Sequence, residues 1–485
     1  MQSRNLKQRA IAGMIWVAVQ RFGTMILSFV SNLILARLLS PTDFGCIGML
    51  AIFIALSGTF IDGGFGSSLV QKTSPTQSDY STIFFWNLSL SVVLYLLIWL
   101  LSPVIASFYE ISILSKILRV QALILIINSL SLVHRARLRK SLKFKVQANI
   151  DLFSAFIAAA IAIILAYRGS GVWSLVAYQL TLNTCSTVGL WLVEKWRPTM
   201  EFDLGSFKSL FRFGGYILMS DLLNTFCDNV QGLIIGKKFS PAVMGYYSQA
   251  KKLEEVPTTT LSGVVAQVVF PVFSEIKDDR PALANAHHKC ILASNYINIP
   301  LMSLLIIVAY PLICFLYSDK WADSAPYFQI LCAGGLANCL QSVNYQLYIA
   351  SGFSKSMFKW NLLKRSVGLA LIFAGAFFNV RAILWGMVIG LWFTYYINAT
   401  LAARITGYSF IRQIIDLCPV FAVTLASSVV TLLAGYLLNV GMIVSLFLQC
   451  AVFLLTYLSL SYIFKLAPFE LYKGIIFDKF NMMKK

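Results

Sequence analysis

The chain has 485 residues, of which 58% are hydrophobic and 12% charged, and its mean hydropathy is +0.75. Soluble chains carry about 25% charged residues to cover their exterior, so this composition excludes soluble globular, disordered and fibrous proteins. The formal net charge of +19 would favour a nucleic-acid partner in a soluble protein, but in a membrane protein it marks cytoplasmic loops. We therefore expect no nucleic-acid partner and predict an all-α polytopic membrane protein.

Fourteen apolar runs follow one another along the chain, and each is long enough for a transmembrane helix of about 20 residues. They cover residues 14–36, 45–66, 82–107, 114–133, 149–167, 172–193, 213–236, 241–273, 291–317, 325–350, 360–379, 382–403, 414–437 and 441–464. The first run is too long for a cleaved signal peptide, so we expect it to remain as an anchor. The sequence thus predicts about 14 transmembrane helices.

The positive charges are distributed unequally between the two sides of this map. With the amino terminus in the cytoplasm, 28 of the 39 Lys and Arg residues fall in cytoplasmic segments, 8 fall on the outer side and 3 lie within spans. The basic run His134–Lys145 is interpreted as a topogenic loop at the anionic inner leaflet. The charges therefore predict a multi-pass protein with both termini cytoplasmic.

An internal repeat divides the chain. Residues 33–45 (LILARLLSPTDFG) match residues 233–245 (LIIGKKFSPAVMG) at five of thirteen positions, and a Ser-Pro pair suits a helix start in both copies. Two independently evolved turns are the alternative to duplication. The repeat predicts an N-terminal lobe of helices 1–6, a C-terminal lobe of helices 7–12, and two further helices with a basic tail. These parts cover residues 1–212, 213–412 and 413–485.

Several short stretches carry a family resemblance. They are residues 36–45, 60–66 with 69–71, 118–120, 169–177, 233–236 with 245–247, 270–273 and 319–321. In these stretches the sequence resembles the WzxC-like polysaccharide flippases of the MATE-like multidrug/oligosaccharidyl-lipid/polysaccharide (MOP) exporter superfamily. It departs from the family pattern at Gln231, where members often carry an acid, although Asp228 lies one turn earlier.

The resemblance implies a fold, a cargo and a location. The fold is a V-shaped bundle of two pseudo-symmetric six-helix lobes, to which this chain adds two C-terminal helices. The cargo is a lipid-linked oligosaccharide of the undecaprenyl-pyrophosphate type, the repeat unit of an O-antigen, lipopolysaccharide or exopolysaccharide. Alternating access moves it from the inner to the outer leaflet of the bacterial cytoplasmic (inner) membrane. A polysaccharide polymerase or co-polymerase is a candidate partner.

Six basic residues at bilayer depth are candidates for a cationic substrate-binding cavity, because a charge inside a span costs about 2.5–3.5 kcal/mol and normally faces protein or water. They are Arg21, Arg119, Lys251, Lys252, Lys364 and Arg365. Such a cavity suits a pyrophosphate group. The alternatives are that Lys251 neutralises Glu255 on the helix surface, that the two arginines snorkel to an interface, and that the last two residues lie at a cytoplasmic helix end.

Embedded acids and tyrosines add further candidates. Asp62, Asp221 and Asp228 are candidates for coupling transport to an ion, Na⁺ or H⁺, and the last two share a helix face. Asp62 precedes a glycine-rich break, so helix capping is its alternative role. Further embedded acids are Asp151, Glu254, Glu255 and Asp416. Three tyrosines are candidates for contacts with sugars, with an interfacial aromatic belt as the alternative. They are Tyr247, Tyr345 and Tyr396.

Missing motifs limit the classes of function. The sequence has no GxxxxGK[ST] phosphate loop, no HExxH cluster, and no CxxC or His/Cys spacing among its nine scattered cysteines. We therefore expect no cofactor, no bound metal and no enzyme activity. A MATE-type cation-coupled drug exporter is an alternative because of the embedded acids. A lipid II flippase, which moves a peptidoglycan precursor, is a further alternative, because it too would need a cationic cavity for an anionic cargo.

Overall fold

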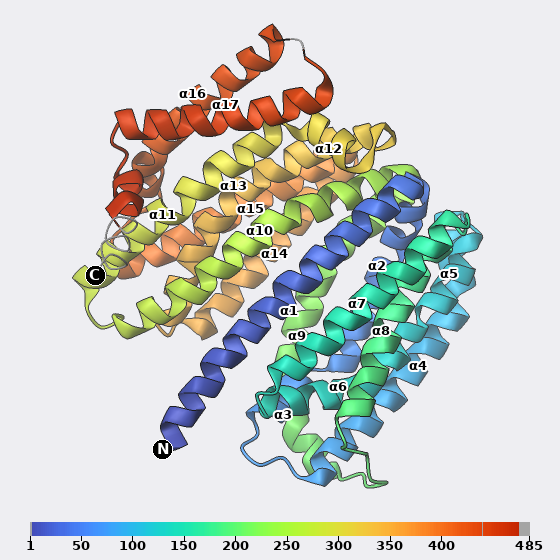
Figure 1. The fold of residues 1–485 in the computed structure, drawn as a ribbon. Helices are drawn as coiled ribbons and strands as arrows, with labels where there is room; N and C mark the ends of the chain where they lie inside the picture. Colours follow the sequence, from blue (N-terminus) through green and yellow to red (C-terminus); the bar gives the residue numbers. More distant parts are fainter. Residues whose placement is uncertain (1, 439, 475–485) are drawn as a thin grey trace. The chain divides into compact units, whose positions relative to one another are not determined.

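The computed structural model describes residues 2–438 and 440–474, and throughout this range every regular element is a helix (Figure 1). The chain forms two compact units, residues 1–245 and residues 246–485. The boundary between them falls inside α10 (Pro241–Glu275), whose first turn belongs to the first unit. The predicted lobe boundaries follow the sequence repeat instead, and they stay a prediction.

The first unit is built from helices α1 to α9. Their bounds are α1 Gln2–Leu38, α2 Pro41–Asp62, α3 Phe65–Gln71, α4 Gln77–Tyr109, α5 Ile113–Gln121, α6 Leu123–Lys140, α7 Phe144–Tyr167, α8 Val172–Val193 and α9 Leu204–Lys238. α1 packs along α7, and α7 packs in turn on α8 (Figure 1). Two of the predicted apolar runs in this unit are each divided between two helices, α2 with α3 and α5 with α6.

The second unit continues from α10. Its other elements are α11 Arg280–Ile307, α12 Ala309–Tyr317, the 3₁₀ helix η1 Asp319–Ser324, α13 Ala325–Ala350, α14 Ser354–Ala376, α15 Val380–Thr406, α16 Phe410–Leu437 and α17 Met442–Ile463. α13 packs against α11 and α15, and α15 also packs against α14. α16 packs against α11 and α17, so the two C-terminal helices are joined to the core of this unit through α11.

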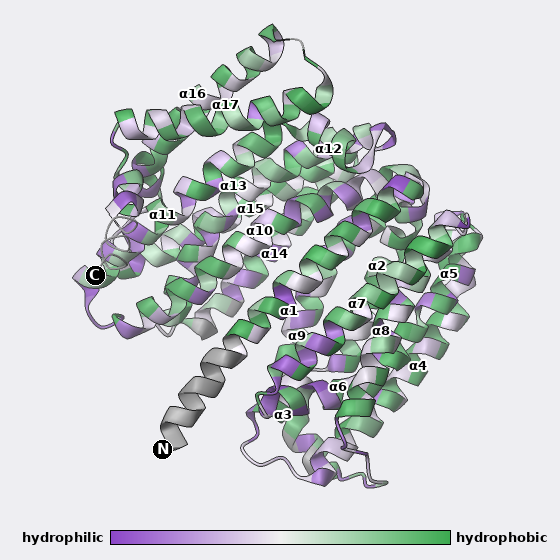
Figure 2. Ribbon diagram, in the orientation of Figure 1, coloured by the Kyte–Doolittle hydropathy of each residue, from purple (hydrophilic) through white to green (hydrophobic). Residues whose placement is uncertain are grey.

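The helices are those of a membrane protein. Ten stretches of the described chain are helical, long and apolar enough to cross a membrane. Figure 2 shows hydrophobic residues along most of α4, α16 and α17. Each of the fourteen predicted runs falls on a helix or on two successive helices. The prediction of an all-helical membrane fold is therefore confirmed. The count of fourteen spans stays a prediction, because α8, α9, α13 and α14 carry polar side chains that lower their hydropathy.

Local sequence determines where α2 begins and ends. The Ser40 side-chain oxygen accepts a hydrogen bond from the Asp43 N–H at 3.3 Å, and Asp43 Oδ2 accepts one from the Ser40 N–H at 2.9 Å. This capping box gives partners to two backbone donors at the helix start. Gly63 and Gly64 have φ values of +54° and +70°, which glycine adopts without strain, so α2 ends at Asp62.

The two Ser-Pro motifs of the sequence repeat meet in the first unit. A Cβ atom added at Gly45 on α2 would lie 1.8 Å from the carbonyl oxygen of Pro241, and one added at Gly245 on α10 would lie 1.9 Å from that of Pro41. Such distances are far below van der Waals contact, so only glycine permits the first turns of α2 and α10 to approach each other this closely. Because the contact is reciprocal, the two copies of the repeat pack against each other at equivalent positions.

Gly45→Ala and Gly245→Ala are each expected to destabilise the protein by about 1–3 kcal/mol, because the added methyl group forces the two helices apart. Thermal unfolding of the purified protein in detergent measures the effect. Gly58→Ala is the matched control on α2, since no heavy atom lies within 4 Å of its added methyl group. Equal melting temperatures for Gly45→Ala and Gly58→Ala would contradict the close crossing.

Candidate functional site

A cavity of about 410 Å³ lies in the first unit between α2, α6 and α8. The polar side chains that line it are Asp62, Asn128, Ser131, Arg135, Arg139 and Asn183. Four of them come from α6 at intervals of three or four residues, which puts them on one face of that helix. We call Asn128, Ser131, Arg135 and Arg139 the arginine face of α6.

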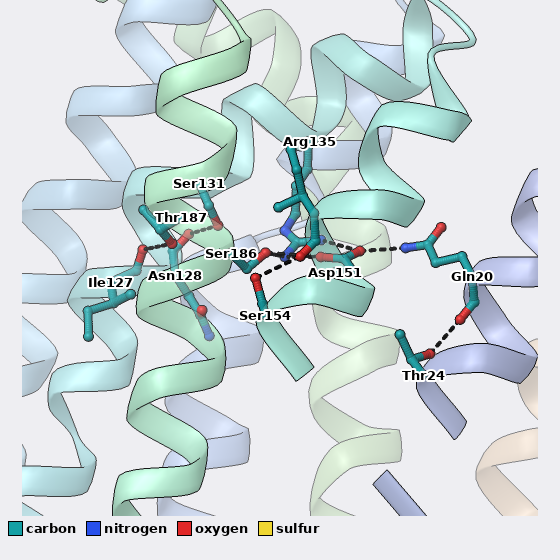
Figure 3. Close-up of polar contacts among 11 residues, drawn as sticks. Gln20, Thr24, Ile127, Asn128, Ser131, Arg135, Asp151, Ser154, Ser186 and Thr187 are labelled. Carbon is teal, nitrogen blue, oxygen red and sulfur yellow. Dashed lines mark hydrogen bonds and ion pairs between the residues drawn. The ribbon is translucent and has the colours of Figure 1, made fainter. Parts of the chain in front are cut away.

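Arg135 is held by a network that joins four helices (Figure 3). Its terminal nitrogens donate to both carboxylate oxygens of Asp151 on α7, at 3.2 and 3.3 Å. Nη2 also donates to Ser186 Oγ on α8 at 2.6 Å, and this hydroxyl donates to Asp151 Oδ1 at 2.9 Å. Gln20 of α1 donates its amide to Asp151 Oδ2. A two-point contact of this kind fixes the plane of the guanidinium.

The network leaves part of the Arg135 guanidinium for the cavity. The side chains of Arg135 and Asp151 are 29% and 14% exposed, so the pair is largely shielded from solvent. A guanidinium has five N–H donors, and the contacts with Asp151 and Ser186 use three of them. The donors that remain, on Nε and Nη1, belong to a side chain that lines the cavity. Arg135 can therefore donate to a ligand without giving up its partners.

Arg139 supplies the second guanidinium of the arginine face. It lies one turn beyond Arg135, is exposed, and lines the same cavity. In the part of the chain that the structure describes, its guanidinium forms no ion pair. Asp151 already neutralises Arg135, so Arg139 adds one net positive charge beside the remaining donors of Arg135. The arginine face therefore favours a ligand that carries negative charge on two neighbouring groups.

The predicted acids of the first unit lie near this cavity or on α9. Asp62 lines the cavity, and the charged groups that act on it are Asp221 of α9 and Arg139. Two carboxylates that repel each other favour a bound cation, as the sequence interpretation requires. Asp228 is exposed two turns further along α9. Among the described residues, no group of three or more His, Cys, Asp or Glu side chains is arranged to hold a metal ion.

Two arginines that were predicted to line a cavity lie elsewhere in the first unit. Arg119 Nε donates to Ser102 Oγ at 2.7 Å, and its guanidinium carbon lies 4.3 Å from the centre of the Trp99 ring. Arg119 therefore lies at the interface between α4 and α5. Arg21 is exposed on α1. Neither side chain is part of the lining between α2, α6 and α8, so their role in substrate binding stays a prediction.

The predicted basic residues of the second unit lie on α10 and α14. Lys251 Nζ lies 3.8 Å from Glu255 Oε1, which is the intrahelical pair that the sequence allowed as the alternative. Lys252, the next residue on α10, is exposed. On α14, Lys364 is buried and Arg365 is half-buried. Of these four residues, Lys364 is the one whose side chain is classed as buried by its solvent exposure.

The three predicted sugar-contacting tyrosines have different surroundings. Tyr345 on α13 is half-buried, and its ring centre lies 5.9 Å from Lys364 Nζ. Tyr396 on α15 is 47% exposed and meets the ring of Phe410 edge-on, with 5.3 Å between the centroids. Tyr247 on α10 is only 2% exposed, so its ring is not available for stacking in this conformation. Tyr345 is thus the tyrosine that the structure brings together with a predicted cation.

The interpretation of His134–Lys145 as a loop is wrong, and its topogenic role stays a prediction. α6 continues to Lys140, so the first half of this basic run is helical. His134 is fully buried, and Arg137 pairs with Glu194 at 3.2 Å. The sequence interpretation therefore missed the arginine face of α6, although the spacing of its residues is visible in the sequence.

Comparison with protein families and sequences gives a consistent result. A family model described as polysaccharide biosynthesis protein matches residues 34–326. The teichuronic acid biosynthesis protein TuaB of Bacillus subtilis (strain 168) is 24% identical over 359 residues, or 74% of each chain. The lipopolysaccharide biosynthesis protein WzxC of Escherichia coli (strain K12) is 24% identical over 442 residues, which cover 90% of this chain and 89% of the relative.

Solved structures share the fold. The lipid II flippase MurJ, in an inward closed conformation, superposes with a TM-score of 0.75 at 16% identity, over 96% of this chain and 100% of the other. An inward-facing multidrug resistance transporter of the MATE family and MOP superfamily superposes with a TM-score of 0.60 at 14% identity. That match covers 81% of this chain and 98% of the other.

Asp151→Asn is expected to destabilise the protein by roughly 1.5–3 kcal/mol, because Arg135 then remains shielded without its counter-charge. The coupling energy between the two side chains is obtained from the unfolding, in detergent, of three variants. They are the single variants Arg135→Gln and Asp151→Asn and the double variant that carries both substitutions. The double variant is expected to lose less stability than the two single losses combined. Additive losses would show that the two side chains do not act as a pair.

An exposed pair in the same unit provides the control for this cycle. Lys237 Nζ lies 2.9 Å from Glu110 Oε1, and this hydrogen bond lowers the pKa of the Glu110 carboxyl group. The Glu110 side chain is 81% exposed, so solvent screens the interaction. Glu110→Gln is therefore expected to leave the melting temperature unchanged.

Proposed function

Since the chain belongs to the polysaccharide biosynthesis protein family, we propose that it is a flippase for lipid-linked oligosaccharides. It carries a repeat unit on a polyprenyl diphosphate, of the undecaprenyl type, from the inner to the outer leaflet of a bacterial cytoplasmic membrane. The name of the relative WzxC, a lipopolysaccharide biosynthesis protein, supports this cargo. The flippase and transporter folds of the solved neighbours agree with alternating access as the mechanism.

The observation that carries the proposal is Arg139, which faces the cavity with no ion-pair partner among the described residues. Together with the remaining donors of Arg135, it offers two guanidinium groups on one helix face. A diphosphate has oxygens on two linked phosphorus atoms, and each phosphate suits the planar fork of one guanidinium.

The direction of transport follows from the predicted topology. With both termini cytoplasmic, the ends of α2 and α6 that carry Asp62 and Arg139 are the inner ends of these helices. The cavity then receives the head group from the inner leaflet while the polyprenyl tail stays in the bilayer. An anionic head group moves toward the positive side of the membrane, and the potential favours this by about 2.3 kcal/mol per charge per 100 mV.

We assign ion coupling to Asp62, which lines the cavity, and to Asp221 of α9, whose charge acts on Asp62. A Na⁺ or H⁺ ion bound between them would relieve their repulsion. A polysaccharide polymerase or co-polymerase would receive the flipped unit on the outer side. No catalytic step is required of the chain, because flipping breaks no covalent bond.

The two alternatives make different demands on the cavity. A cation-coupled drug exporter would hold a cationic cargo against carboxylates, and the arginine face of α6 opposes this. A lipid II flippase would also hold a diphosphate, so the arginine face suits it equally well. The family of the chain favours a polysaccharide repeat unit over the peptidoglycan precursor.

Arg139→Gln is expected to slow flipping of undecaprenyl-diphosphate-linked N-acetylglucosamine in reconstituted vesicles by about 10- to 100-fold, because it removes charge-assisted hydrogen bonds to the diphosphate. Arg139→Lys is expected to recover only part of the rate, since an ammonium cannot bind in a bidentate manner. Arg168→Gln, between α7 and α8 and outside the cavity lining, is the control. Full activity of Arg139→Gln would overturn the assignment of the arginine face to the diphosphate.

A further inference from the structure

A polar stripe runs along α13 in the second unit. Asn338, Gln341 and Tyr345 are spaced by three and four residues, so they share one face of the helix, and all three are half-buried. Polar side chains at bilayer depth are rare and normally face a water-filled cavity or protein partners. The stripe is therefore a candidate for a binding surface rather than a lipid contact.

Two polar residues from neighbouring helices are connected to the stripe by hydrogen bonds. Lys364 Nζ on α14 donates to Asn398 Oδ1 on α15 at 2.8 Å. Asn398 Nδ2 donates to the backbone and side-chain oxygens of Gln341, both at 3.2 Å. Gln341 Nε2 then donates to Asn338 Oδ1 at 3.0 Å. We call Asn338, Gln341, Tyr345, Lys364 and Asn398 the α13 polar cluster.

The direction of every hydrogen bond in the cluster is set by Lys364. An ammonium group only donates, so Asn398 must turn its oxygen toward Lys364 and its NH₂ group toward Gln341. Gln341 accepts with its oxygen and donates with its nitrogen, and Asn338 accepts with its oxygen. The NH₂ group of Asn338, at the half-buried end of this series of hydrogen bonds, is left as a donor.

Within the part of the chain that the structure describes, Lys364 itself lacks a counter-charge. It is 6% exposed, and beyond Asn398 its described contacts are Met357 Sδ at 3.7 Å and the Tyr345 ring centre at 5.9 Å. Among the described residues, no Asp or Glu forms an ion pair with it. A thioether is a weak acceptor, so two of the three ammonium donors have no strong partner. A buried cation in this situation favours an anionic ligand that reaches it.

We propose that the α13 polar cluster is a subsite for an acidic sugar, whose carboxylate binds Lys364. The proposal rests on the proposed function, because it assigns the glycan part of the same cargo. The side-chain amides of Gln341 and Asn338 bind hydroxyl groups, and the Tyr345 ring packs on the apolar face of the sugar. A single ammonium among neutral amides matches a sugar with one negative charge better than a diphosphate with several. Since Gln341 and Tyr345 are half-buried, the sugar enters along α13.

The test is binding of two soluble probes, methyl glucuronoside and methyl glucoside, to the purified full chain. Saturation-transfer difference NMR measures their affinities without any need for flipping, so its result is independent of the vesicle assay. The wild type is expected to bind the glucuronoside at least tenfold more tightly than the glucoside. Equal affinity for the two probes, or no binding of the glucuronoside, overturns the subsite.

Variants separate a binding role of Lys364 from a structural one. Lys364→Met keeps the bulk of the side chain and is expected to reduce glucuronoside affinity at least tenfold, so that the preference for the glucuronoside over the glucoside is lost. Asn398→Asp is expected to have the same effect, because it gives Lys364 an internal carboxylate partner; it serves if the first variant does not fold. Lys359→Met, at an exposed position of the same helix, is the matched control. Wild-type affinity of both folded variants for the glucuronoside overturns the proposal.

The diphosphate of the lipid is the other anion that Lys364 could receive. Farnesyl diphosphate, added as a competitor, distinguishes the two sources. It is expected not to displace methyl glucuronoside, because the diphosphate is assigned to the arginine face of α6. Displacement from the wild type, with no displacement from Lys364→Met, would assign Lys364 to the diphosphate and overturn the sugar subsite.

Discussion

The ion pair between Arg135 and Asp151 is the interaction on which the candidate site depends. A charged side chain at bilayer depth has no water to solvate it, so a neighbouring helix must supply its partner. Asp151 does this with both carboxylate oxygens, while Ser186 and Gln20 occupy the remaining acceptor positions of the carboxylate. The pair thereby fixes α1, α6, α7 and α8 to one another around the arginine that lines the cavity.

The same pair determines the charge of the cavity. Because Asp151 neutralises Arg135, Arg139 and Asp62 are the charged groups of the lining that form no ion pair among the described residues. A cation and an acid in one small cavity can serve two ligands, a diphosphate and a coupling ion. The second unit uses a different arrangement, in which neutral amides orient Lys364 and supply no counter-charge. The two proposed sites thus suit different parts of one lipid-linked glycan.

Much of the fold could be predicted from the sequence. A run of about 20 apolar residues has one favourable conformation in lipid, so hydropathy alone located the helices. The repeat identified which turns correspond, and in the structure Gly45 and Gly245 each meet the proline of the other copy. The site was harder to predict, because partners such as Ser102 for Arg119 depend on tertiary packing. The arginine face of α6 could not be recognised from the sequence, because the positive-inside rule already explains positive charges at this position without any role in ligand binding.

The proposed role of the cavity between α2, α6 and α8 is to bind a diphosphate through its two arginines. Isothermal titration of the purified protein with farnesyl diphosphate and with farnesyl trimethylammonium compares an anionic and a cationic head group on one lipid chain. The diphosphate is expected to bind, with an affinity that falls as the salt concentration is raised, and the ammonium lipid is expected not to bind. Preferential binding of the ammonium lipid would contradict this proposed role.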